Sequence, residues 1–406
     1  MNLSLFIARR YFLSKRKRNF INIISGLSIV AIAFSTAALV IVLSVFNGLE
    51  GLLRTLNSAF DPEIKIEAAK GKTFEATHEL LSKIESVTGV AIATEVLEDY
   101  GYVRYRDADM VVTMKGVGDN FIDQHRIDPS IVDGKLKLRD SLGQYAILGK
   151  GIQYQLSVSV NESIYPLQVF YIKNGKTTID PTKLYSVSAI QPGGVFSIEK
   201  NFDENYVLLP IDFVRHLTGY HNRCTSLEIK TTSGSNIQKI KNAIQQQLGN
   251  DFVVLTNDEQ HQELYKLVKI EKLFTFISMG LLAAIASINI FFSLMMLAIE
   301  KKKDISIFFA MGAQKSTIKN IFLKEGALIA GSGAMAGLLL GALVCWAQDQ
   351  FGLVSMGMES AIVNAYPVKM KLVDFASIGS VMIVITFLTS FYPALLASRS
   401  YSANQL

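Results

Sequence analysis

The sequence predicts a membrane α-helical protein with four transmembrane helices and a large α+β domain inserted between helices 1 and 2. Segments 20–46 and 273–299 are almost unbroken apolar sequence. Each is long enough, as a helix, to cross a hydrocarbon core that is ~30 Å thick. More than two hundred residues of ordinary soluble composition, residues 47–272, separate the two segments. We therefore expect a water-soluble domain held between two membrane spans.

Two further apolar segments follow, and they complete the set of spans. Residues 327–346 and 375–396 are rich in Ala, Leu, Ile, Val and Gly and carry no internal charge. A short loop, 347–374, connects them, and residues 397–406 form a tail. Four crossings are an even number, so both ends of the chain are expected on the same side of the membrane.

Lysine and arginine near the span ends predict the orientation. Basic residues gather before the first span and again in segment 300–326, between the second and third spans: Arg9, Arg10, Lys15, Arg16, Lys17, Arg18, Lys301, Lys302, Lys303, Lys315, Lys319 and Lys324. Such residues are retained on the cytoplasmic side. The large domain and the loop 347–374 must then lie outside.

The net charge of +5 reflects this topology rather than a nucleic-acid partner. Residues 47–272 hold 29 acidic and 25 basic residues, which leaves that domain at −4 and the remainder of the chain at +9. No basic stripe for phosphates stands out in the pattern. We expect no nucleic acid among the partners.

Residues 1–19 are expected to form an amphipathic interfacial helix. Its apolar sector holds Leu3, Phe6, Ile7, Tyr11 and Leu13, and the opposite side carries Arg9, Arg10 and Ser14. A cationic amphipathic segment beside a span lies most simply in the headgroup plane. A positive flank that only fixes topology remains the alternative. The following apolar run exceeds the roughly 7–15 residues of a cleavable signal, so we expect an uncleaved anchor.

The outer domain reads as α+β with a helical stalk at each end. Strand patterns occur at 64–67, 100–106, 110–117, 164–172, 184–190, 206–210, 225–230 and 252–256, and helical patterns at 75–86, 211–217 and 236–248. Segments 49–60 and 258–272 keep helical spacing and are expected to continue the first two spans as stalks. The two cysteines, Cys224 and Cys345, fall in different solvents, so no disulfide framework is expected.

Segment 300–326 carries an apolar ridge that needs a partner. Ile305, Phe308, Phe309 and Met311 are expected to give a short helix an exposed apolar side. Gly312 is placed to end that helix, and Ser316 to cap the next one. Such a ridge can insert into a groove of a soluble subunit, as anchor residues do in helix-in-groove recognition. The alternative is that it folds back against the membrane.

Four stretches resemble the lipoprotein-releasing ABC transporter permeases. They are Phe6-Ile-Ala-Arg-Arg-Tyr-Phe, then Phe20-Ile-Asn-Ile-Ile-Ser-Gly with Val40-Ile-Val-Leu-Ser-Val-Phe-Asn-Gly-Leu-Glu50, and Tyr392-Pro-Ala-Leu-Leu-Ala-Ser398. Segment 300–326 is similar to the same family and to its macrolide-exporter and cell-division relatives. The Asn47-Gly48-Leu49-Glu50 form favours the lipoprotein-releasing branch. The tail departs from many relatives, because Ser402 stands where they have proline.

The resemblance implies a permease with a periplasmic domain between its first two spans, in a bacterial inner membrane, with both termini cytoplasmic. Its implied partners are a dimer of ABC ATPase subunits that carry ATP and Mg, a second permease that is identical or homologous, membrane lipids and an acylated lipoprotein. The coupling helix of the family maps onto Asp304 to Gly312.

Site residues are also carried over from the family. Lipoprotein acyl chains enter laterally between the first and second spans, which makes candidates of Val42, Val45, Phe46, Leu267, Ile270, Phe274 and Ile277. One family member grips a periplasmic lipoprotein carrier with a protruding hairpin. The matching segment, Tyr171 to Tyr185, contains the turn signal Asn174-Gly175 and the ladder-breaking Pro181. An ordinary β-hairpin is the alternative for that segment.

The chain itself is expected to be non-catalytic and to hold no cofactor or metal. Lys315-Ser316 follows Gln314, where a phosphate loop needs glycine. Gly331-Ser-Gly-Ala-Met-Ala-Gly337 lies within a span, where small residues let helices approach closely. The five histidines are scattered through the outer domain. Two other functions stay open: an efflux permease of the macrolide-exporter type for peptides or drugs, and a signalling permease that regulates a cell-wall hydrolase without transport.

Overall fold

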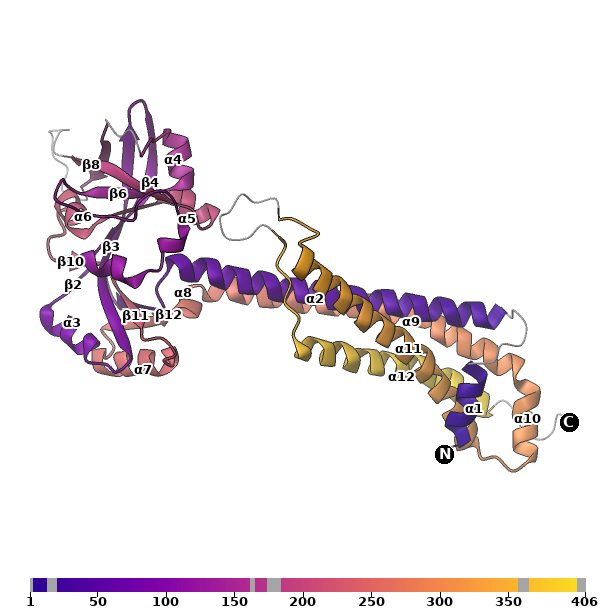
Figure 1. Cartoon of the computed structure of the whole chain (residues 1–406). Helices are drawn as coiled ribbons and strands as arrows, with labels where there is room; N and C mark the ends of the chain where they lie inside the picture. The colour runs from indigo at the N-terminus through magenta and orange to yellow at the C-terminus, as the bar shows by residue number, and fades with distance from the viewer. Residues whose placement is uncertain (1–2, 13–19, 161–164, 174–183, 357–364, 400–406) are drawn as a thin grey trace. The chain divides into compact units, whose positions relative to one another are not determined.

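The computed structural model describes residues 3–12, 20–160, 165–173, 184–356 and 365–399 (Figure 1). The chain divides into two compact units. We call residues 1–51, 266–356 and 365–406 the membrane unit, and residues 52–265 and 357–364 the outer unit. Each unit is described by itself below.

Four long apolar helices make up most of the membrane unit. They are α2 (Phe20–Phe60), α9 (Gln262–Glu300), α11 (Lys315–Phe351) and α12 (Leu372–Arg399), and each is long and apolar enough to cross a membrane. α2 continues without a break through the predicted stalk 49–60. α9 covers the predicted stalk 258–272 only from Gln262, because a separate short helix, α8 (Asn257–Gln260), precedes it. Two short helices, α1 (Leu3–Phe12) and α10 (Lys302–Ala310), complete this unit.

Glycines on α11 allow close packing against α2. A methyl group added at Gly333 would lie 2.8 Å from the carbonyl oxygen of Ile29, and one added at Gly341 would lie 2.7 Å from Cβ of Val40. Both distances are too short for a real side chain, so only glycine permits this helix separation. The interpretation of the small-residue run as a helix-packing surface is therefore confirmed.

The N-terminal helix α1 packs on α11 through small residues. Ser4 and Ala8 are buried, and Lys324 of α11 donates a hydrogen bond to Oγ of Ser4 at 2.7 Å. Leu3 and Phe6 remain exposed. The apolar sector predicted for this helix is thus divided: Ile7 and Tyr11 contact the core of the membrane unit, whereas Leu3 and Phe6 face away from it.

The outer unit is built on a long, mixed sheet. Within the described residues its strands run in the order β12-β1-β11-β3-β4-β9-β6-β8-β5, and β7 pairs with both β3 and β8. The bounds are β1 Ile64–Ala68, β3 Val90–Tyr105, β4 Ala108–Val117, β5 Ile131–Gly134, β6 Tyr145–Gly149, β7 Leu167–Ile172, β8 Tyr185–Phe196, β9 Tyr206–Pro210, β11 Ser226–Thr231 and β12 Phe252–Thr256. A separate two-stranded sheet pairs β2 (Phe74–Glu75) with β10 (Arg223–Cys224).

Short helices cover this sheet. They are α3 (His78–Glu85), α4 (Lys150–Leu156), α5 (Lys200–Asn205), α6 (Ile211–Thr218), α7 (Ile237–Leu248) and α8 (Asn257–Gln260), with 3-10 turns at Asp119–Gln124 and Asp128–Ser130. Every predicted strand and helix is present. Strands β2, β5, β6 and β10 and helices α4 and α5 were not predicted, because their short apolar runs show too little periodicity.

Strand β3 connects the two halves of the outer unit, as Figure 1 shows. Its first half pairs with β11, and its second half pairs with β4 and β7. Ala93 on the first half belongs to a core with α3 and α7, whereas Leu97 and Val103 belong to a second core under α4 and α6. A third core gathers around the end of α2 at Phe60. Cys224 and Cys345 are both free and buried, as expected.

Candidate functional site

Helix α10, which overlaps the predicted coupling helix, has nine residues and presents two different apolar faces. Ile305, Phe308 and Phe309 lie on the face that packs into the core of the membrane unit. Ile305 is only 1% exposed. The expectation that Ile305 belongs to an exposed ridge is therefore wrong. A short helix lying against a helical bundle must bury one face, and positions i, i+3 and i+4 share that face.

The other side of α10 and its C-cap residue, Met311, carry exposed apolar side chains. Met311 is 69% exposed and Ile307 is 55% exposed. Gly312 ends the segment in a left-handed conformation with φ of +87°, as predicted from its position. Asp304 is half-buried and lies 3.8 Å from the ammonium of Lys301. The most exposed apolar residues of this segment are thus Ile307, which the sequence did not indicate, and Met311. The predicted ridge residues Phe308 and Phe309 are half-buried.

The turn after α10 differs from expectation. Helix α11 begins at Lys315 with Gln314 as its N-cap residue, and the side chain of Gln314 makes no capping hydrogen bond. Ser316 instead bonds to the side chain of Gln314 at 3.3 Å. The predicted capping role of Ser316 is therefore wrong, because the helix begins one residue before it.

A continuous apolar stripe runs along α9. Leu267, Ile270, Phe274 and Ile277 recur at helical spacing, and each side chain is more than half exposed. Exposed apolar residues continue the same pattern toward the other end of the helix at Leu281, Ile285, Ile288 and Phe292. The structure thus brings four of the seven predicted acyl-chain residues onto one face. An exposed apolar stripe of this length requires lipid, substrate or another helix to cover it.

The three predicted substrate residues on α2 lie in a more crowded environment. Val42, Val45 and Phe46 are all half-buried. Each is therefore partly available to a ligand and partly packed against the chain itself.

The end of α2 is anchored in the outer unit by an aromatic cluster. Phe60 is 1% exposed, stacks on Phe202 with ring centroids 4.4 Å apart, and meets the edge of Tyr206 at 4.7 Å. The ammonium of Lys115 lies over the same Phe60 ring at 4.4 Å. Aromatic pairs and a desolvated cation–π contact of this kind fix the last turn of the helix to the sheet.

Lys115 also belongs to a buried ionic network. Its ammonium lies 2.7 Å from the carboxylate of Glu228, which is fully buried, and Arg126 binds the other carboxylate oxygen at 2.6 Å. Burial alone would raise the pKa of Glu228, but the charges of Lys115 and Arg126 outweigh burial and lower it to about 2. The network therefore stays ionised and joins β4 to β11 beside the anchored helix end.

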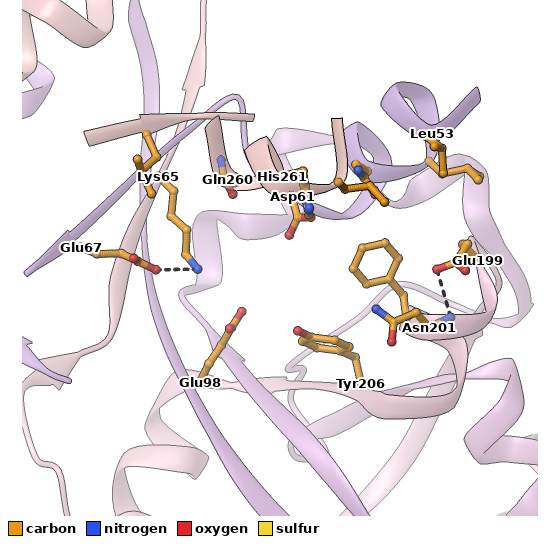
Figure 2. Close-up of a pocket in the computed structure, with 15 residues that line it drawn as sticks. Leu53, Asp61, Lys65, Glu67, Glu98, Glu199, Asn201, Tyr206, Gln260 and His261 are labelled. Atoms are coloured by element: carbon orange, nitrogen blue, oxygen red, sulfur yellow. Dashed lines mark hydrogen bonds and ion pairs between the residues drawn. The ribbon is translucent and has the colours of Figure 1, made fainter. Parts of the chain in front are cut away.

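A cavity of about 520 Å³, lined by both polar and apolar side chains, lies beside this anchor in the outer unit (Figure 2). Glu98 and Tyr206 point into it, while Asp61 pairs with His261 at 2.7 Å across its rim. Burial alone would lower the pKa of Lys65, but the nearby carboxylates, Glu98 foremost, raise it, so the ammonium stays charged. The Asp61–His261 pair joins the residue after α2 to the residue before α9, and so fastens both stalks to each other.

A shallow aromatic groove lies on the sheet next to the predicted carrier hairpin. Tyr100, Tyr102, Phe170, Ile172 and Tyr185 line it, and its volume is about 650 Å³. Strands β7 and β8 pair antiparallel, from Leu167 opposite Ile190 to Ile172 opposite Tyr185. The predicted tip residues Asn174, Gly175 and Pro181 lie outside the described residues. The alternating tyrosines of β3 were a signal for this groove that the sequence reasoning did not use.

Comparisons with known proteins place this architecture in a family. The model of the FtsX-like permease C-terminal region matches residues 276–401, and that of the MacB-like periplasmic core domain matches residues 25–247, more than half of the chain. LolC of Xylella fastidiosa, a lipoprotein-releasing system transmembrane protein, is 24% identical and aligns with 100% of this chain and 98% of its own length. The chain belongs to the family of permeases with a MacB-like periplasmic core domain.

Other relatives agree over the full length. LolC of Neisseria meningitidis is 23% identical and LolE of Haemophilus influenzae is 22% identical, and each alignment covers 100% of this chain and 99% of the relative. Among solved structures, the periplasmic region of MacB from Actinobacillus actinomycetemcomitans aligns with 52% of this chain and 94% of its own, at 12% identity and a TM-score of 0.35.

Family membership settles the general architecture of this permease. It is a multi-pass membrane protein with four candidate spans and a periplasmic α+β domain between the first and second of them. Among the described residues, no group of three or more His, Cys, Asp or Glu side chains is arranged to hold a metal ion.

Proposed function

We propose that this chain is the permease subunit of an ABC transporter that extracts lipoproteins from the outer leaflet of the bacterial inner membrane. ATP and Mg bind on a separate ATPase dimer, and this chain pairs with a second, identical or homologous permease. Both termini and segment 300–326 face the cytoplasm, and residues 47–272 face the periplasm. The resemblance of the whole chain to LolC and LolE supports this assignment.

The observation that carries the proposal is the apolar stripe on α9. Leu267, Ile270, Phe274 and Ile277 offer acyl chains a continuous surface that leads from the membrane toward the stalk. Moving acyl chains out of hydrocarbon costs ~0.8 kcal/mol per CH₂, so release of several chains needs an external energy source. That requirement accounts for an ATPase partner.

Mechanotransmission follows from the continuity of the helices. Ile307 and Met311 dock in the ATPase, and the inner face of α10 at Ile305 carries the resulting motion into the membrane unit. α2 and α9 extend unbroken from the spans into the stalks. The anchor at Phe60 then moves the periplasmic domain, where the aromatic groove beside the β7–β8 hairpin receives a lipoprotein carrier.

The test is release of a lipoprotein from proteoliposomes that contain the complete transporter. We expect ATP-dependent release of an acylated protein, and none of the same protein lacking its acylated cysteine. Ile277→Ala should slow release several-fold. Leu282→Ala should not, because Leu282 is similarly exposed but lies off the stripe. Two results would overturn the proposal: export of a soluble peptide or drug without lipoprotein release, or activation of a cell-wall hydrolase without any release.

A further inference from the structure

Three polar side chains meet at one end of the spans in the membrane unit. Asn47 lies on α2, Lys272 on α9 and Asp374 on α12. Asn47 is only 1% exposed, although it follows a long apolar run. Burying an amide costs free energy unless its oxygen and its nitrogen both form hydrogen bonds. The hydrogen-bond partners of Asn47 therefore indicate its role.

Asn47 uses both ends of its amide. Its Nδ2 donates to the carboxylate of Asp374 at 2.5 Å and to the carbonyl oxygen of Lys369 at 3.1 Å. Its Oδ1 accepts from the ammonium of Lys272 at 2.8 Å. Lys272 and Asp374 complete the triangle with a direct contact of 3.2 Å. Three helices distant in sequence are therefore joined at one point by charge-assisted hydrogen bonds.

The segment before α12 is fastened to α2 at the same level. The backbone N–H of Lys369 donates to the carbonyl oxygen of Ser44 at 2.9 Å. A methyl group added at Gly48 would lie 2.7 Å from the backbone nitrogen of Val368 and would overlap Pro367. Only glycine lets this segment cross α2 so closely. The two residues Asn47 and Gly48 thus have distinct structural roles. The amide of Asn47 links the helices by hydrogen bonds, and Gly48 leaves room for the segment that crosses α2.

We infer that Asn47, Lys272 and Asp374 are positioning residues for transport: they form a clasp that makes α2, α9 and α12 move as one body at this end. This inference rests on the proposed function. The cavity for acyl chains then opens and closes at the boundary with the second permease, and not by separation of α2 from α9 within one chain.

Isosteric substitutions test the clasp in the complete transporter. Asn47→Leu keeps the branched shape of the side chain and removes the three hydrogen bonds. Lys272→Met keeps an unbranched side chain and removes the charge. Each should lower lipoprotein released per ATP hydrolysed at least five-fold, with assembly and basal ATPase activity retained. Lys371→Gln is the matched control, because the ammonium of Lys371 lies nearby at 3.8 Å from Glu50 and contacts none of the three clasp side chains in the ion pairs of the described residues. A purely structural role would lower assembly and leave this ratio unchanged, which would overturn the inference.

Cross-linking tests whether the clasp stays closed during the cycle. The double variant Asn47→Cys with Asp374→Cys should hydrolyse ATP with little lipoprotein release. A short bis-methanethiosulfonate bridge between the two thiols should restore at least half of the wild-type release per ATP. The native Cys224 and Cys345 are buried, and the two single variants control for their reaction. If the bridged transporter stops releasing lipoprotein, the clasp must open and the inference is wrong.

One readout does not depend on the substrate. Amide hydrogen exchange at Lys369 should accelerate at least ten-fold in Asn47→Leu and remain unchanged in Lys371→Gln. Unchanged exchange in Asn47→Leu would overturn the clasp even if the wild-type transporter releases lipoprotein. Conversely, wild-type protein that shows the clasp by exchange and releases no lipoprotein would refute the proposed function alone.

Discussion

The two faces of α10 give a sharp prediction about the ATPase partner. Met311 is 69% exposed in the isolated chain, so roughly two-thirds of its side chain is left for a partner to bury. Full burial of such a side chain stabilises by ~1.5–3 kcal/mol, which leaves ~1–2 kcal/mol for docking. Since 1.4 kcal/mol corresponds to a tenfold change in affinity, Met311→Ala should weaken ATPase binding roughly 5- to 30-fold.

The assay is the affinity of the purified ATPase for the detergent-solubilised permease. Ile307→Ala should weaken binding to a similar degree, because Ile307 is 55% exposed on the same face. Ile305→Val is the control: Ile305 is buried, so the change should cost ~0.5–1.5 kcal/mol of chain stability and leave ATPase affinity unaltered. Wild-type affinity in both Met311→Ala and Ile307→Ala would refute the docking of this face.

Three further predictions concern the periplasmic domain and the spans. The pKa of Glu228 is about 2 when folded, against an ordinary value of 4.5, so its contribution to stability is complete above pH 4.5 and is lost as pH falls toward 2. Glu228→Gln should remove this dependence from urea midpoints measured between about pH 6 and about pH 3. Gly337→Ala should lower thermal stability by ~1–3 kcal/mol, because the methyl group meets Thr36 at 2.6 Å, whereas Gly331→Ala, with open space, should change it by under ~0.5 kcal/mol. Ile172→Asp in the aromatic groove should abolish carrier capture in a pull-down, and Tyr154→Asp, an exposed residue of α4, should not.

Periodicity predicted the elements of this chain well, because hydrophobic spacing reports directly on helices and half-buried strands. The four spans, the stalks and the principal strands all carry that signal. The same signal led to the wrong prediction that Ile305 is exposed. Periodicity indicates an apolar face but does not show whether the chain itself or a partner covers that face. The predicted capping role of Ser316 was wrong for a similar reason. Cap residues are predicted from local sequence, and helix ends vary by one or two residues.

The contacts that organise the site were beyond sequence reasoning. Asn47, Lys272 and Asp374 are more than a hundred residues apart in sequence, and no local pattern pairs an amide with a distant ion pair. The motif around Asn47 was recognised only as a resemblance, and its physical role emerged from geometry. Likewise, Lys115 and Glu228 sit on strands where isolated charges are ordinarily expected to face solvent.

Thiol labelling tests the central claim, that α10 meets a cytoplasmic ATPase while the α+β domain lies across the membrane. Gln314→Cys places a thiol at an exposed position just after α10, and Tyr100→Cys places one on the exposed groove. A membrane-impermeant maleimide should label Tyr100→Cys in intact spheroplasts and should label Gln314→Cys only after lysis. Labelling of Gln314→Cys in intact spheroplasts would contradict the account.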